Sequence, residues 1–244
     1  MFLSSLLFLL PLSASAKPFV IATLDMPPHV ALKVEAPKPE GAIPNFVEQY
    51  LAAPLKAQHG LIIEWHQAPL ARAIKAVETG EADMLFFISK NPEREKVFVF
   101  SSEPFFTDTA ALLVKKDSTP LDEVKNIALY KNKTIGMTEG VATPEIVKKN
   151  NIQILLVPGN AYIENSLDLV AQNRMDAFLS PLSSVGEYIV HTSKREVKLK
   201  SLKIAGSERD YYVIFSKKLA PKVRETINTL LQKHRAEYPK LIKY

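Results

Sequence analysis

A short helix–turn–strand pattern occurs twice in this chain, and it constrains the fold more than any other feature. Its matching positions, equally spaced in the two copies, are Val77 and Val170, Gly80 and Asn173, and Asp83 and Asp176. Gly and Asn are the residues that best tolerate the left-handed conformation at which a helix ends. Although such units are common in α/β proteins, two of them far apart favour two α/β lobes of similar construction.

The first copy predicts an amphipathic helix followed by a buried strand. Leu70, Ile74 and Val77 share one face at helical spacing, and Gly80 supplies the residue at which that helix ends. Met84–Ile88 is a short apolar run, which is typical of a strand buried on both faces.

The turn after this strand predicts a place to hold an anion. Asn91 is a good helix cap, Pro92 suits the first helical position, and Arg94 follows within the first turn. Free backbone N–H groups and a guanidinium can converge at such a turn. The alternative is that Arg94 is a solvated arginine at a helix end and that Ser89 only caps the turn.

The remaining pattern alternates strands and helices. Residues 19–24 and 61–65 predict strands on either side of a helix over 45–58, which Pro54 should kink. Further strands are expected at 110–114, 133–137, 152–157, 175–179, 197–204 and 211–216, with helices opening at Thr143 and spanning 161–172, 182–191 and 221–237.

This order predicts an α/β fold of two lobes, each a mostly parallel sheet flanked by helices. The first lobe is expected to comprise residues 17–108 and 210–244, and the second lobe residues 109–209. The chain would cross between the lobes twice, making a two-strand hinge and a cleft. The aromatic residues that flank the crossings are expected to pack the hinge: Phe105, Phe106, Tyr211 and Tyr212.

Residues 1–16 are expected to be a cleaved signal peptide. The run from Phe2 to Leu12 is apolar but too short for a membrane span, and Ala14-Ser15-Ala16 has the small-x-small pattern of a cleavage site. Cleavage after Ala16 would give a periplasmic protein without a membrane anchor, and a retained anchor helix is the alternative.

Composition excludes several classes of protein. The chain has no cysteine, which rules out disulfides, thiolate metal sites, a cysteine nucleophile and a lipid anchor on cysteine. The net charge of +5 is scattered, without the basic, aromatic-interleaved stripe that nucleic acid requires. No histidine spacing suggests a metal site, so we expect no bound metal. We also expect no cofactor, and we expect the protein to be a monomer.

Several of these segments together resemble the periplasmic solute-binding proteins of ABC importers, in the branch that carries amino acids and other small polar solutes. The matching segments are GEADMLFF, NPER, FSSEPFF, KTIGM, NRMDAFLS and YYVIFSKKLAPKVRETINTLL. The resemblance covers nearly the whole chain after residue 16 and implies the type II periplasmic binding fold. It also implies closure of two lobes over a small solute and delivery to permease subunits.

The resemblance implies a role for Arg94 as the clamp on a ligand carboxylate, assisted by Ser89. The family's second carboxylate contact falls at Val141 and Ala142, where Thr143 is the nearest hydroxyl. The acid that holds a ligand amine would fall at about Pro181, so that acid is missing. A small carboxylate or another polar anion therefore fits better than a standard α-amino acid, whose buried ammonium would be unmatched.

Five further residues are candidates to contact the ligand: Asp25, His29, Trp65, Thr143 and Ser180. Met26 or His29 could replace the family's aromatic platform, and Trp65 could form a stacking wall or pack in the core. Ser180 ends a buried strand and could contact the ligand or cap the next turn.

Two alternative functions are compatible with the same fold. The chain could be a ligand-sensing module for a signalling partner. It could also be a dehydratase-like enzyme, which would need an acid or base in the cleft, and Glu139 and Asp25 are the only carboxylates placed near it.

Overall fold

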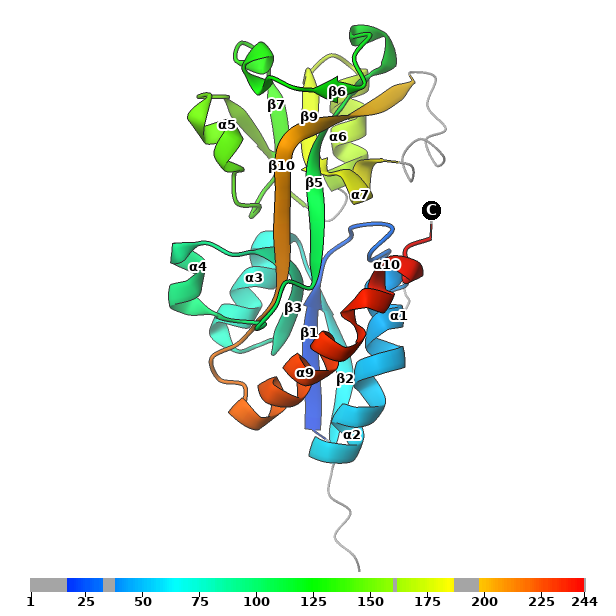
Figure 1. The fold of residues 1–244 in the computed structure, drawn as a ribbon, viewed down its shortest axis with the longest axis vertical. Coiled ribbons are helices and arrows are strands. Elements are labelled where there is room, and N and C mark those ends of the chain that lie inside the picture. Colours follow the sequence, from blue (N-terminus) through cyan, green and yellow to red (C-terminus); the bar gives the residue numbers. More distant parts are fainter. Residues whose placement is uncertain (1–16, 33–37, 160–161, 187–197, 244) are drawn as a thin grey trace, which may run out of the picture.

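The computed structural model describes residues 17–32, 38–159, 162–186 and 198–243. The predicted signal peptide and the end of the predicted helix 182–191 lie outside this part. Two lobes are stacked along the long axis of the molecule, and two long strands connect them (Figure 1). Within the described residues, no helix is long and apolar enough to span a membrane.

The first lobe has a parallel sheet in the order β2–β1–β3. Its strands are β1 (Lys17–Thr23), β2 (Leu61–Gln67) and β3 (Met84–Ser89), and every residue of β3 is buried, as predicted. Its helices are α1 (Ala42–Phe46), the π-helical η1 (Val47–Ala52), α2 (Ala53–His59), α3 (Leu70–Thr79) and α4 (Pro92–Val97). The wide π turn lies just before Pro54, where proline lacks an N–H and crowds the carbonyl four residues earlier.

The second lobe has a second set of parallel strands in the order β9–β7–β8. These strands are β7 (Ile135–Thr138), β8 (Ile154–Val157) and β9 (Ala177–Pro181). Helices α5 (Glu145–Lys149), α6 (Tyr162–Ala171) and α7 (Leu182–Val185) belong to this lobe. Short elements complete it: η2 (Lys116–Ser118), β6 (Glu123–Val124) and η3 (Ile127–Tyr130).

Strands β5 (Phe106–Lys115) and β10 (Leu199–Phe215) run side by side through both lobes (Figure 1). The prediction of two separate strands at 197–204 and 211–216 was wrong, because β10 continues through Gly206. Only the ladder is irregular there, between Lys203 and Glu208, and Gly206 has a φ of +67°. All the long strands therefore form one sheet, in the order β2-β1-β3-β10-β5-β9-β7-β8. The proposed lobe boundaries fall where Asp108 faces Arg209 on this ladder.

Both predicted helix stops are present. Gly80 follows α3 with a φ of +78°, and Asn173 follows α6 with a φ of +59°. The left-handed region is the one that Gly and Asn tolerate best, so the repeated sequence pattern corresponds to a repeated backbone turn.

The two repeated aspartates have the same structural role. The Oδ2 atom of Asp83 accepts a hydrogen bond of 2.8 Å from the backbone N–H of Val20, and the Oδ2 atom of Asp176 accepts one of 2.8 Å from Thr134. The backbone N–H of each aspartate donates to the carbonyl of that same partner. Each aspartate thus joins the start of its strand to a neighbouring segment of its own lobe.

The core follows the alternation of side chains along β5. Ala111 and Leu113 belong to a large cluster that runs from the first lobe onto one face of the second, whereas Leu112 and Val114 belong to a smaller cluster on the opposite face. Because successive side chains of a strand point to opposite faces, β5 is buried on both.

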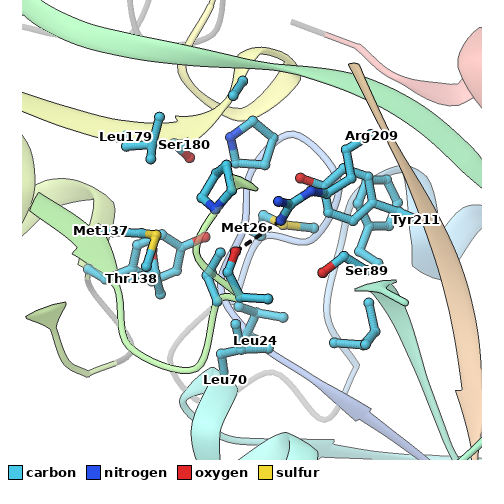
Figure 2. Close-up of a pocket in the computed structure, with 18 of the residues that line it drawn as sticks. Leu24, Met26, Leu70, Ser89, Met137, Thr138, Leu179, Ser180, Arg209 and Tyr211 are labelled. Carbon is cyan, nitrogen blue, oxygen red and sulfur yellow. Dashed lines mark hydrogen bonds between the residues drawn. The ribbon is translucent and has the colours of Figure 1, made fainter. Parts of the chain in front are cut away.

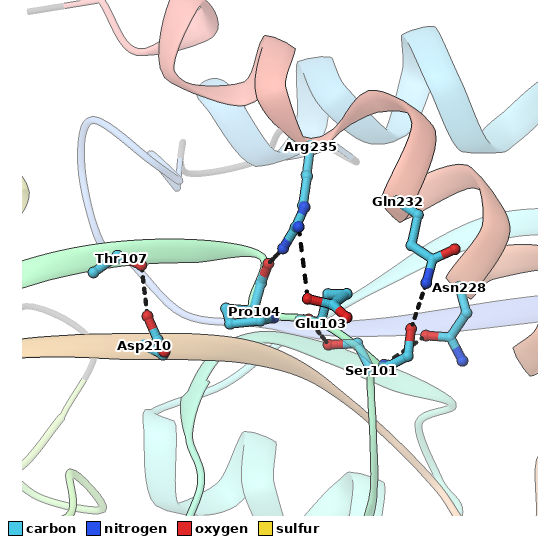
Figure 3. Close-up of polar contacts among 9 residues, drawn as sticks. Ser101, Glu103, Pro104, Thr107, Asp210, Asn228, Gln232 and Arg235 are labelled. Carbon is cyan, nitrogen blue, oxygen red and sulfur yellow. Dashed lines mark hydrogen bonds and ion pairs between the residues drawn. The ribbon is translucent and has the colours of Figure 1, made fainter.

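The C-terminal helices α9 (Pro221–His234) and α10 (Tyr238–Leu241), joined by η4 (Arg235–Glu237), pack on the first lobe. Arg235 donates to the carbonyl of Pro104 at 2.6 Å and lies 3.6 Å from Glu103 (Figure 3). Gln232 donates to the Ser102 hydroxyl, and Asn228 accepts from the Ser102 N–H. These contacts hold the segment between β4 (Val99–Phe100) and β5 against α9 and η4.

Candidate functional site

A cavity of about 70 Å³ lies between the two lobes, where β3, β7, β9 and β10 approach one another. Its lining is mainly apolar, and its polar side chains are Ser89, Arg94, Thr138, Tyr162, Ser180, Ser207, Arg209 and Tyr211. Since a buried water needs roughly 10–15 Å³ on this measure, the space fits a small molecule or several waters.

The capped turn positions Arg94 in the wall of this cavity. The Asn91 side chain accepts from the Arg94 N–H at 2.8 Å, which confirms the predicted cap, and Pro92 begins α4. The Nη1 atom of Arg94 donates to the Ser89 carbonyl at 2.8 Å and to the Ser89 hydroxyl at 2.9 Å. Its Nη2 atom donates to the Gly140 carbonyl of the second lobe at 2.8 Å.

Arg94 is therefore not a solvated helix-end residue. Its side chain is half-buried, and burial, together with the nearby charge of Arg209, lowers the pKa of its guanidinium. A guanidinium has five N–H groups, so it can still donate to a ligand beside these three acceptors. Ser89 is an acceptor that orients Arg94, and the cap of the turn is Asn91.

Ser180 and Thr138 face the cavity from the second lobe (Figure 2). Ser180 is buried near the end of β9, opposite Ala111 of β5, and Thr138 is buried at the end of β7. Both follow the general rule that ligand sites of open α/β sheets lie beyond the carboxyl ends of strands.

Sequence reasoning missed Arg209 as a site residue and placed Tyr211 only in hinge packing. Ser207, Arg209 and Tyr211 alternate along β10 and all line the cavity. A period-2 pattern in one continuous strand would have revealed them, but the chain was divided at Gly206. Burial raises the pKa of Tyr211 to about 12, so its hydroxyl stays protonated at neutral pH.

Arg209 reaches across to the second lobe. Its Nη1 atom donates to the carbonyl of Ala142 at 2.9 Å, the bond dashed in Figure 2. Together with the bond from Arg94 to Gly140, it gives the cavity two guanidiniums that each contact the loop after β7.

Two sequence candidates near β1 lie outside the cavity lining. Asp25 accepts from the Leu32 N–H at 3.0 Å, and burial raises the pKa of its carboxyl group. His29 is fully buried, with Nδ1 at 2.5 Å from the Tyr238 hydroxyl and Nε2 at 2.6 Å from the Ser183 hydroxyl. Burial lowers the pKa of His29 to about 3, so the ring is neutral. The structure thus makes His29 a contact between lobes rather than a wall of the cavity.

Two other candidates also lie elsewhere. Trp65 of β2 packs against the first-lobe core and lines a separate depression beside Val47 and Glu48. Thr143 lies in an outer groove and does not cap a helix, because α5 begins at Glu145 with Pro144 as its cap residue. How buried Trp65 and Thr143 are would not have shown that they lie outside the lining of the interlobe cavity.

The acids proposed for the enzymatic alternative do not line the cavity. Glu139 is exposed, and Asp25 is engaged with the Leu32 N–H as described. Among the residues with described positions, no group of three or more His, Cys, Asp or Glu side chains could hold a metal ion.

The family model described as bacterial extracellular solute-binding proteins, family 3, matches residues 20–243 of this chain. No curated protein matches the sequence.

Solved structures share the fold at low identity. An amino acid ABC transporter substrate-binding protein, AbpA from Streptococcus pneumoniae bound to L-arginine, has a TM-score of 0.71 at 22% identity, covering 92% of both chains. An ancestral arginine-binding protein bound to arginine has a TM-score of 0.70 at 22% identity, covering 93% of this chain and 97% of that one.

The ancestral amino acid-binding protein AncCDT-1, a precursor of cyclohexadienyl dehydratase, has a TM-score of 0.70 at 19% identity, covering 94% and 96% of the two chains. At these identities the likeness concerns the two-lobed α/β architecture alone.

Proposed function

The chain belongs to the bacterial extracellular solute-binding proteins of family 3, and we propose that it closes over a small carboxylate-bearing solute and delivers it to an ABC importer. One observation carries the choice of a carboxylate. Arg94 lies in the wall of the interlobe cavity, held by Ser89, with N–H groups left to donate. A guanidinium matches a carboxylate with two parallel hydrogen bonds, which a point charge such as lysine does not.

The rest of the lining supports a carboxylate without an ammonium group. No aspartate or glutamate lines the described cavity, and the position expected to hold a ligand amine is Pro181. An ammonium enclosed there would lose its hydration without gaining a counter-charge, at a cost of several kcal/mol. The arginine bound by AbpA and by the ancestral arginine-binding protein is thus a poor model for the ligand of this chain.

Closure is supported by the bonds between lobes. Arg94 donates to Gly140 and Arg209 donates to Ala142, so both cationic walls also hold the second lobe. A solute that adds contacts to both lobes would stabilise this closed form, which importer subunits could then recognise. With the predicted cleavage after Ala16, the proposed location is the periplasm, and no catalytic step is required.

The proposal is tested by thermal-shift screening of the purified protein against small carboxylates and amino acids, followed by calorimetry on each hit. We expect carboxylates without an amine to raise the melting temperature. Arg94→Gln should abolish binding, and Arg94→Lys should weaken it about tenfold or more, because lysine lacks the planar fork.

Arg174→Gln is the matched control, since Arg174 is exposed after α6 and does not line the cavity. It should bind as the unaltered protein does. Normal binding by Arg94→Gln would show that the carboxylate clamp is assigned to the wrong residue.

A further inference from the structure

Arg209 is a second cationic wall of the cavity, and it comes from a different element than Arg94. It alternates with Ser207 and Tyr211 on the cavity-facing side of β10, and its side chain is half-buried. Figure 2 shows its guanidinium pointing into the cavity, whose lining also includes the apolar side chains of Met26 and Leu24. Its single hydrogen bond to a described residue, from Nη1 to the Ala142 carbonyl, leaves further N–H groups for a ligand.

The charge of the cavity is unbalanced. Arg94 and Arg209 are both cationic and near enough that Arg209 disfavours the charged form of Arg94. Three carboxylates line a neighbouring groove together with Arg209, and all three are exposed: Glu145, Glu208 and Asp210. Two partly buried carboxylates, Asp25 and Asp108, lie outside the cavity lining and already accept hydrogen bonds. Asp25 accepts from Leu32, and Asp108 accepts from the backbone N–H and the hydroxyl of Ser183.

Two partly buried cations facing one small space are costly unless a counter-charge enters. A single carboxylate on Arg94 would offset only one of them. A ligand with two negative groups would offset both, and hydrogen bonds to each guanidinium would be charge-assisted.

Apart from its hydroxyl groups and the two guanidiniums, the lining of the cavity is apolar. Leu24, Met26 and Leu70 come from the first lobe, and Met137 and Leu179 come from the second. These side chains offer no hydrogen-bond partner to a hydroxyl or amine in the middle of a ligand. The cavity volume of about 70 Å³ suits a short molecule.

Resting on the proposed function, we propose that the ligand is a short aliphatic dicarboxylate without an amine, with one carboxylate on Arg94 and the other on Arg209. Arg94 is the clamp that any carboxylate ligand needs. Arg209 selects for the second negative charge.

The test is calorimetry with a dicarboxylate series from malonate to adipate, each paired with the monocarboxylate of equal carbon number, such as succinate with butyrate. We expect at least one dicarboxylate to bind about tenfold or more tightly than its monocarboxylate partner. Aspartate and glutamate, which add an ammonium, should bind more weakly than succinate and glutarate.

Two variants separate the roles of the arginines. Arg209→Gln keeps hydrogen-bonding capacity and removes the charge, so it should weaken dicarboxylate binding about tenfold or more beyond any loss of monocarboxylate affinity that follows from losing the bond to Ala142. Arg94→Gln should abolish binding of both. If Arg209 only held the lobes together, its replacement would weaken dicarboxylate and monocarboxylate binding to the same extent.

Two outcomes would overturn the inference. If mono- and dicarboxylates bind equally, or if Arg209→Gln weakens both equally, Arg209 only ties the lobes together, while the proposed carboxylate function stands. If no carboxylate in either series binds, the proposed function fails and the dicarboxylate inference fails with it.

Discussion

The Nε2 atom of His29 lies 2.6 Å from the hydroxyl oxygen of Ser183, although the two residues belong to opposite lobes. Both are buried, and the contact is part of a longer chain of polar groups. The Nδ1 atom of His29 contacts the Tyr238 hydroxyl, and the Ser183 hydroxyl donates to Asp108 in β5. The C-terminal helix α10, the loop after β1, the second lobe and a connecting strand are thereby joined.

Replacing His29 should weaken closure. Phenylalanine would keep the ring contacts with Phe87 and Phe106 but remove both hydrogen bonds of the imidazole. We expect His29→Phe to lower the free energy of unfolding by about 1–3 kcal/mol. We also expect it to lower ligand affinity, because under the proposed closure mechanism the contact with Ser183 would form only when the lobes are closed. Urea unfolding and calorimetry measure the two effects.

Tyr238→Phe is the control, because it removes the contact to His29 within the first lobe and leaves the contact between lobes. It should cost stability but leave affinity nearly unchanged. An equal loss of affinity in Tyr238→Phe and His29→Phe would contradict a role for His29 in closure.

The same histidine should make stability depend on pH. Burial lowers the pKa of His29 to about 3 in the folded protein, against 6.5 in the unfolded chain. Below pH 6.5 the imidazole of His29 is therefore protonated in the unfolded chain but stays neutral in the folded protein. Stability should fall as the pH drops from 6.5 towards 3, by up to about 1.4 kcal/mol per pH unit from this one group.

Partly buried acids change stability with pH in the opposite direction to His29. The effect of His29 is therefore measured as the difference in stability between the unaltered protein and His29→Phe at each pH. Burial raises the pKa values of Asp25 and Asp108, which favours the folded protein as the pH falls. Their contribution should largely cancel between the unaltered protein and His29→Phe. Identical pH slopes in the two proteins would show that His29 does not titrate as expected.

Gly140 should control how closely the lobes approach. Its φ is +89°, and an added Cβ atom would lie 3.0 Å from the N atom of Ala71 and 3.2 Å from Leu70 Cγ, both in α3 of the first lobe. We expect Gly140→Ala to lower ligand affinity about tenfold, because the added methyl group opposes full closure. Calorimetry with the best carboxylate from the screen measures it.

Gly159→Ala separates backbone strain from this clash. Gly159 has a φ of +99°, but among the residues with described positions no atom lies within 4 Å of its added Cβ. Both variants should lose about 1–2 kcal/mol of stability, and only Gly140→Ala should lose affinity. A similar loss of affinity in both would mean that strain, rather than closure, is responsible.

The two repeated aspartates should differ in their contribution to stability. Asp83 is half-buried and holds the Val20 N–H, whereas Asp176 is exposed, holds Thr134 and lies 3.3 Å from Lys133. We expect Asp83→Ala to cost about 1–3 kcal/mol and Asp176→Ala less than about 1 kcal/mol. If urea unfolding gave the same loss of unfolding free energy for both variants, burial would not determine how much this hydrogen bond contributes to stability.

Local features of the fold were readable from the sequence. The cap at Asn91, the helix stops at Gly80 and Asn173, and the buried strand from Met84 were all predicted and are all present. Each depends on residues within about one turn or one strand, where backbone preferences and side-chain period act directly. Arg94 could be placed for the same reason, since its turn is defined by its immediate neighbours.

The part of the cavity lining that β10 supplies could not be predicted from local sequence patterns. Arg209 and Tyr211 line the cavity because β10 continues past Gly206 and pairs with β5, a relationship between strands nearly a hundred residues apart. His29 follows β1 like a ligand-binding loop residue, yet its partners Ser183 and Tyr238 are distant in sequence and bury it.

Most helices and strands, the repeated unit, the capped arginine and, through the matching segments, the family followed from sequence patterns alone. Which side chains share one cavity and which connect the lobes became clear only from the three-dimensional structure. Local patterns specify backbone conformation over a few residues. The charge and shape of a cavity between lobes depend instead on long-range strand pairing and packing.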